Sequence, residues 1–150
     1  MIRRLGSLIA LGLAACTAGG IPTSSGSGGG VTIDVSLTQF AQSPTPYGPS
    51  LGYSPAVTTV AVGTQIHFVN VDTFAHTATV IQGATTFPSG FSFPASALQQ
   101  KGTTLSSNWS SGALQPNQSS QTITADQPGT YLFGCFFHYA GGMRAAIVAQ

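Results

Sequence analysis

Short runs of alternating apolar and polar residues, separated by glycine and proline, are the feature that most limits how this chain folds. In VTIDVSL, residues 31–37, every second residue is apolar, which is the period of a strand with one buried face. The run VTTVAVGTQIHFVNVD, residues 57–72, contains two β-rich segments divided at Gly63, where a tight turn is expected. No segment after residue 30 has sustained helical periodicity. The pattern predicts an all-β domain, either an antiparallel sandwich or a barrel.

Further strands are predicted toward the C terminus. They cover HTATVIQ (76–82), the part of QTITADQPGTYLFGC (121–135) that follows its Pro-Gly turn, and MRAAIVAQ (143–150). Proline and glycine are dense enough in residues 42–55 to predict a loop. Residues 82–120 lack a clean period and leave open whether they hold a strand or a short helix.

The N-terminal segment has the features of a bacterial export signal. Arg3 and Arg4 precede a short apolar stretch, which ends in LAAC at residues 13–16. Small residues before a lone cysteine resemble the lipobox of bacterial lipoproteins, which implies a signal peptide over 1–15 and a lipid on Cys16. An ordinary secretory signal with an incidental cysteine is the alternative. Both interpretations place the mature protein outside the cytoplasm, in the periplasm or at the cell surface, and the first anchors it to a membrane.

Residues 16–30 are rich in glycine and serine and are expected to form a flexible tether. The remaining residues, 31–150, are enough for a single domain with its own core. That domain carries two cationic side chains and three carboxylates, so it has no basic patch for nucleic acid. It also has no glycine-rich phosphate loop and no Gly-x-Ser-x-Gly elbow, which argues against nucleotide-binding and hydrolase functions.

A cluster of metal-capable side chains lies in GCFFHYAGGM, residues 134–143. The chain has only two cysteines, three histidines and two methionines, yet Cys135, His138 and Met143 share this stretch. With His76 upstream they make two imidazoles, a thiolate and a thioether, which is the ligand set of a blue-copper site. Zinc fits less well, because structural zinc seldom takes a thioether. A single cysteine in a strand is otherwise a small buried hydrophobe.

The same residues carry a resemblance to a known family. The Cys-x2-His-x4-Met spacing, together with VGTQIHFVNVDTFAHT and PGTYLFGC, resembles the cupredoxins, and most closely the plastocyanin and pseudoazurin type. The resemblance implies a single-domain, antiparallel Greek-key β-sandwich with one type 1 copper ion. It also implies that His76, Cys135 and His138 are strong ligands and that Met143 is the axial ligand.

The chain departs from the family pattern at three places. Thr77 stands where many relatives have an asparagine that braces the ligand loops, and Phe137 stands where plastocyanins have proline. The loop over 42–55 has no obvious counterpart. These departures leave the ligands intact but bear on the reduction potential and on the rigidity of the loops.

Aromatic residues surround the ligand histidines in the sequence and are interpreted as packing around the metal or as an apolar rim for docking a redox partner. With so few charges, we expect apolar contact to guide docking more than electrostatic steering. Among other residues, His67 is expected on the surface, and Asn70 and Asp72 are expected to be turn formers rather than catalytic groups. Trp109 and Tyr131 are expected to be core or corner residues. The residues of the predicted docking surface are Phe74, Phe136, Phe137 and Tyr139.

These observations favour a membrane-tethered type 1 copper protein that shuttles single electrons between extracytoplasmic redox proteins, of the cytochrome or copper oxidase type. It is expected to be a monomer with no small-molecule substrate and no nucleic-acid partner. A copper carrier, delivery protein or sensor is the alternative, but such proteins tend to use open sites rich in methionine or histidine. An enzyme is disfavoured, because His67 is the one histidine left for a further copper site.

Overall fold

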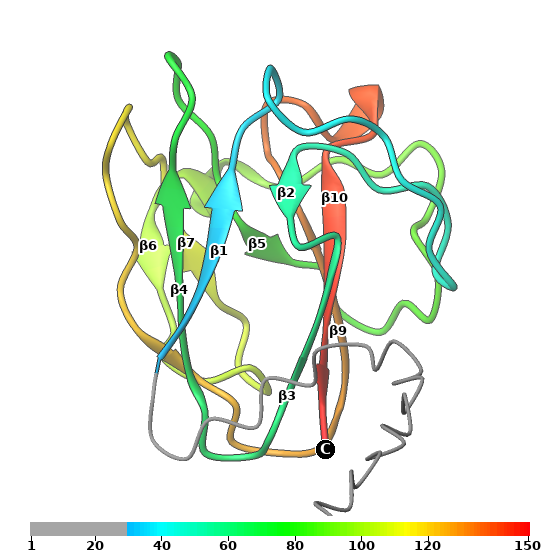
Figure 1. The fold of residues 1–150 in the computed structure, drawn as a ribbon, viewed down its shortest axis with the longest axis vertical. Coiled ribbons are helices and arrows are strands. Elements are labelled where there is room, and N and C mark those ends of the chain that lie inside the picture. Colours follow the sequence, from blue (N-terminus) through cyan, green and yellow to red (C-terminus); the bar gives the residue numbers. More distant parts are fainter. Residues whose placement is uncertain (1–29) are drawn as a thin grey trace, which may run out of the picture.

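Two β-sheets pack face to face in the computed structural model, which describes residues 30–150 (Figure 1). The predicted signal peptide, Cys16 and the tether up to residue 29 lie outside the described residues. The two short 3-10 helices are η1 (Ala95–Leu98) and η2 (Tyr139–Gly141). The strands are β1 (Val31–Val35), β2 (Tyr53–Ser54), β3 (Val57–Val60), β4 (Gln65–Asn70), β5 (Thr79–Val80), β6 (Gln100–Lys101), β7 (Ser110–Ser111), β8 (Ile123–Thr124), β9 (Gly129–Gly134) and β10 (Arg144–Ala149).

The alternating pattern predicts a sandwich or a barrel, and the sandwich that the family resemblance implies is confirmed, but its sheets are mixed rather than antiparallel throughout. The first sheet has the order β2-β1-β4-β8, and the second has the order β3-β10-β9-β5-β7-β6. Strands β1 and β4 pair in parallel, as do β10 and β3. The parallel pairing of β1 with β4 arises because the chain crosses to the second sheet as β3 before it returns.

The inner core lies between the sheets and comes from the residues that alternate inward along the strands. The ring of Phe68 on β4 stacks on Trp109 at 5.5 Å and meets the edge of Phe133 on β9 at 5.2 Å. Each fully buried large apolar side chain contributes about 1.5–3 kcal/mol. The fully buried strand residues of the inner core include Ile33, Val35, Ile66, Phe68, Ile123, Phe133, Ala145 and Ile147.

A second group of apolar residues, the outer cluster, covers the other face of the second sheet. Leu132 and Ala146 point to this face, opposite to their neighbours Phe133 and Ala145. Because both faces are covered, β9 and β10 read as nearly continuous apolar runs. The segment that the sequence left unassigned supplies much of the cover. The outer cluster consists of Ile81, Phe93, Ala97, Leu132, Tyr139 and Ala146.

One end of the sandwich gathers the predicted ligands. Strand β4 ends and β10 begins at the upper end in Figure 1, where η2 also lies, and the C terminus is at the opposite end. Pairing of Gly134 with Arg144 brings the end of β9 to the same place. Within residues 30–150, no helix is long and apolar enough to span a membrane.

Candidate metal centre

The loop between β9 and β10 is closed by its own backbone hydrogen bonds. The Cys135 N–H donates to the Met143 carbonyl at 3.0 Å, and the Met143 N–H donates to the His138 carbonyl at 3.2 Å. Gly142, with φ of 98°, reverses the chain after η2. Glycine is also needed at residue 134, where a Cβ would lie 2.5 Å from the ring of Tyr139. This closure holds Cys135, His138 and Met143 at one end of the sandwich.

His76 reaches the same point from the loop that follows β4. Its N–H donates to the Leu114 carbonyl at 3.1 Å and its carbonyl accepts from the Leu114 N–H at 2.8 Å. Asn70 braces the loop from its start, because its amide donates to the carbonyls of Phe74 and Leu114 at 2.8 and 2.9 Å. Its side-chain oxygen accepts from the Asp72 N–H at 2.9 Å. Asn70 is thus the turn former that the sequence predicts.

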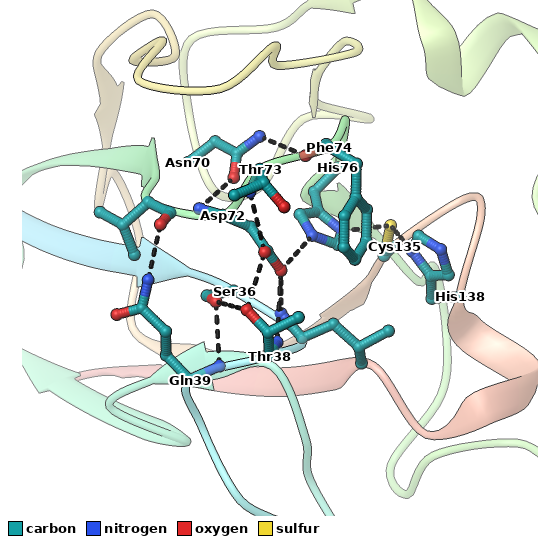
Figure 2. Close-up of polar contacts among 12 residues, drawn as sticks. Ser36, Thr38, Gln39, Asn70, Asp72, Thr73, Phe74, His76, Cys135 and His138 are labelled. Atoms are coloured by element: carbon teal, nitrogen blue, oxygen red, sulfur yellow. Dashed lines mark hydrogen bonds and ion pairs between the residues drawn. The ribbon is translucent and has the colours of Figure 1, made fainter.

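The structure brings the distant histidine and the two local ligands together, as Figure 2 shows. Cys135 Sγ lies 3.8 Å from His76 Nδ1 and 3.6 Å from His138 Nδ1. The three ligand atoms all lie within 4.8 Å of one another. His76 and Cys135 are buried, whereas His138 is partly exposed. The nitrogen that faces the sulfur is Nδ1 in both histidines.

These separations fit a shared metal ion. With metal–sulfur and metal–nitrogen bonds of about 2.3 and 2.0 Å, a sulfur and a nitrogen spread at a trigonal angle lie about 3.7 Å apart. The observed 3.6 and 3.8 Å match this value. Met143 is fully buried, and its thioether packs against Gly52. Imidazole suits Cu(II) and sulfur ligands suit Cu(I), so the donor set is suited to copper in both oxidation states.

Thr77 braces the cysteine that follows β9. Its N–H donates to Cys135 Sγ at 3.4 Å, and its hydroxyl accepts from the Phe136 N–H at 2.8 Å. Its carbonyl accepts from the Tyr53 hydroxyl at 2.6 Å. Thr77 therefore ties the two ligand loops together.

The surroundings tune two of the ligands. Burial raises the pKa of the Cys135 thiol, and hydrogen bonds from nearby backbone N–H groups, including that of Thr77, oppose this effect. Burial also lowers the pKa of His138, and the neighbouring His76 lowers it further. A lowered pKa favours the neutral form of the His138 imidazole, which is the form that metal binding requires. Metal binding to Cys135 would displace its thiol proton.

Asp72 has a larger part in the site than the turn-forming role predicted for it. Its carboxylate accepts a hydrogen bond from His76 Nε2 at 3.0 Å, and both side chains are fully buried. Burial acts to raise the pKa of Asp72, but hydrogen bonds from Thr73, His76, Thr38 and Leu37 outweigh it and hold the pKa well below its usual range. The sequence holds one indication of this contact, because one of only three aspartates in the chain lies four residues before His76.

The predicted docking residues do not share one environment. Phe74 and Phe137 are exposed, at 37% and 45%, and their rings lie 5.6 and 6.1 Å from that of His138. Phe136 is half-buried against the outer cluster. Tyr139 is only 4% exposed and packs on Phe91 and Phe93. Its placement on the docking surface is therefore wrong, because the ring turns inward from the loop that carries His138.

The remaining residues singled out in the sequence lie away from this centre. His67 is half-buried on β4 and hydrogen-bonds the Thr32 hydroxyl at 2.9 Å. Trp109 is in the inner core, as expected. Tyr131 packs against that core, and its hydroxyl donates to the Gln127 carbonyl at 3.0 Å.

Comparison with known proteins gives a family match and a fold match. The model of the family described as "Copper binding proteins, plastocyanin/azurin family" matches residues 45–150. An oxidised methionine-to-leucine mutant of amicyanin is 13% identical, with a TM-score of 0.51 over 85% of this chain and 88% of that chain. A purple cupredoxin from Nitrosopumilus maritimus is 18% identical, with a TM-score of 0.49 over 80% of this chain and 99% of that chain. No curated protein matches the chain. The likeness to amicyanin concerns the fold.

Proposed function

Because the chain belongs to the plastocyanin/azurin family of copper-binding proteins, we propose that it holds one copper ion and carries single electrons between redox proteins. The observation that supports this most directly is the convergence of His76 Nδ1, Cys135 Sγ and His138 Nδ1 within 4.8 Å. In this proposal the three side chains are the strong ligands and Met143 is the axial one. Copper bound there supplies a one-electron couple, Cu(II)/Cu(I).

The protein contributes a site that moves little when the electron is transferred. The loop from Cys135 to Met143 is closed by its backbone, and Thr77 ties it to the loop that carries His76. Burial of His76 and Cys135 limits the access of water. Ligands held in this way suit both oxidation states without rearrangement, which favours rapid electron transfer over catalysis on a substrate.

We propose that the partner docks over His138. This ligand is partly exposed, and Phe74 and Phe137 flank it with exposed apolar rings. Asp72 is buried, and apart from it the domain has only four charged side chains, which are Asp34, Asp126, Lys101 and Arg144. Apolar contact, rather than steering by charge, is the docking mode that such a surface supports.

The proposed setting of the protein rests on its N-terminal sequence. LAAC, residues 13–16, supports lipidation at Cys16 and a location outside the cytoplasm, with residues 16–30 as a tether. If lipidation occurs, the wild-type chain partitions with membranes, and Cys16→Ser releases it to the soluble fraction. A wild-type chain that is soluble and lacks a lipid by mass spectrometry would favour simple secretion.

The function is tested on the full-length chain, purified in mild detergent and loaded with one equivalent of Cu(II). An intense visible thiolate-to-copper band that bleaches on reduction, with narrow copper hyperfine splitting, is expected. Cys135→Ser should abolish the band, and His67→Ala, the matched control, should leave it unchanged. A pale, ordinary Cu(II) spectrum would contradict the electron-transfer centre. Rapid loss of Cu(I) to a mild chelator would instead support a carrier.

A further inference from the structure

The hydrogen bond between Asp72 and His76 is the single close contact between a carboxylate and a histidine, lysine or arginine side chain among residues 30–150. Asp72 Oδ2 lies 3.0 Å from His76 Nε2, and both side chains are fully shielded from solvent. An ionised carboxylate can only accept a hydrogen bond, so Nε2 carries the proton. In the neutral imidazole, His76 Nδ1, which faces Cys135 Sγ at 3.8 Å, then keeps a free lone pair. The contact thus selects the imidazole tautomer that can bind a metal.

The carboxylate is itself held from several sides, as Figure 2 shows. Oδ2 accepts from the Leu37 N–H at 2.7 Å, and Oδ1 accepts from the Thr38 hydroxyl and the Thr73 N–H, both at 2.8 Å. Leu37 and Thr38 follow β1, the neighbour of β4 in the first sheet. Asp72 cannot shift without breaking these bonds, so the imidazole that it holds is fixed relative to the first sheet.

The fixed imidazole faces ligands that come from the other sheet. Cys135 and His138 follow β9, which belongs to the second sheet. The orientation of His76 therefore decides whether the two halves of the site meet. The backbone bonds between His76 and Leu114 place its Cα, but they leave the ring free to rotate. Asp72 holds that rotation with a hydrogen bond to Nε2, and the ring of Phe74 packs against the imidazole with centroids 4.8 Å apart.

On the basis of the proposed copper function, we propose that Asp72 is a positioning residue that sets the tautomer and orientation of His76 and favours Cu(II) over Cu(I). A carboxylate hydrogen-bonded to a ligating histidine makes the imidazole a stronger donor. Its buried negative charge also interacts more favourably with the more highly charged oxidised ion. Removing the charge should therefore weaken Cu(II) binding more than Cu(I) binding, and the reduction potential should rise.

The test compares Asp72→Asn with Thr38→Ala in the full-length chain. Asparagine keeps the shape and one acceptor but removes the charge, whereas Thr38→Ala removes one bond to the carboxylate and leaves the charge. Loss of a carboxylate partner typically lowers metal affinity by about 10–100-fold. We expect Asp72→Asn to lower the affinity for Cu(II) by this factor. For each factor of ten by which the affinity for Cu(II) falls more than the affinity for Cu(I), the reduction potential rises by about 59 mV. Thr38→Ala should change the potential much less.

A second readout needs no copper. The ¹⁵N shifts of the histidine side chains in the metal-free protein report the tautomer, with His67 and His138 as internal references. The wild-type His76 should be protonated at Nε2 alone, and Asp72→Asn should populate both tautomers. A wild-type His76 protonated at Nδ1 overturns the proposal, even if Asp72→Asn fails to fold.

The copper readout separates positioning from support of the fold. If Asp72→Asn and Thr38→Ala lower stability equally and leave the potential unchanged, Asp72 only supports the loop and the proposal is wrong. If the wild-type protein lacks the intense visible band, the electron-transfer function fails. The tautomer measurement then still decides whether Asp72 orients His76.

Discussion

Gly52 lies directly against Met143, and replacing it with alanine tests whether this contact sets the position of the thioether. The backbone at Gly52 has φ of +78°, and an added Cβ would lie 2.8 Å from Met143 Cγ and 3.3 Å from its Sδ. A left-handed backbone costs an alanine about 1–2 kcal/mol. Forcing a methyl group into a packed core costs about 1–3 kcal/mol more. We therefore expect Gly52→Ala to lower the free energy of unfolding by about 2–5 kcal/mol.

Gly63 provides a matched control for the backbone term. Its φ is +92°, and an added Cβ would have no atom within 4 Å. Gly63→Ala should therefore lower the free energy of unfolding by only about 1–2 kcal/mol, which is the cost of the left-handed backbone. Since about 1 kcal/mol corresponds to about 4 °C in Tm for a domain of this size, the two variants should be separable by thermal unfolding of the metal-free protein.

The copper-loaded variants give the decisive comparison. Gly52→Ala should displace Met143 and change the visible and electron paramagnetic resonance spectra, because the axial ligand tunes a blue-copper site. Gly63→Ala should leave both spectra as in the wild type. Equal losses of Tm and identical spectra in the two variants would refute the idea that Gly52 positions the axial ligand.

Three further predictions follow from the site and its surroundings. Phe137→Ala should slow electron self-exchange between copper-loaded molecules about tenfold, equivalent to about 1.4 kcal/mol of docking energy. Val62→Ala, also at an exposed apolar residue, should leave the rate unchanged. A steep fall of the wild-type rate with added salt would count against apolar docking. Thr77→Val removes the acceptor of the part-buried Phe136 N–H and should lower the free energy of unfolding in urea by about 1 kcal/mol. Thr77→Ser should stay near the wild type, and equal losses in the two variants would contradict this role. Because the pKa of Asp72 is held below its unfolded value of about 3.9, its stabilising effect is present above that pH and is lost only as pH falls through the lower folded value. The metal-free protein should therefore keep its circular dichroism at pH 4, and loss of structure between pH 5 and pH 4 would show the reasoning to be wrong.

Local patterns were enough to predict the elements that carry the ligands. Cys135, His138 and Met143 lie within one nine-residue loop, so their proximity follows from chain connectivity and not from the tertiary fold. Strands β9 and β10, which flank this loop, show the alternating or continuous apolar residues expected of strands that are buried on one face or on both. His76 could be added because its segment resembles that of a known family, and the structure places its ring beside Cys135.

Features that depend on distant parts of the chain could not be predicted in the same way. Parallel pairing of β1 with β4 does not change the alternation of apolar and polar residues along either strand, so the sequence does not reveal it. Tyr139 is buried by Phe91 and Phe93, which belong to the segment that had no readable period. Aspartate is common in turns, so the sequence predicts only a turn-forming role for Asp72. Its burial depends on Leu37 and Thr38, more than thirty residues earlier in the sequence.

The division of the site between two sheets links electron transfer to the packing of the inner core. His76 and Asp72 follow β4 in the first sheet, whereas Cys135 follows β9 in the second. The distance between the two groups is therefore set by the side chains between the sheets, among them Phe68 and Phe133 at 5.2 Å. Protein interiors are packed too tightly to deform continuously. The core thus opposes the ligand movements that a change in oxidation state would otherwise drive, and rigidity at the site is a property of the whole sandwich.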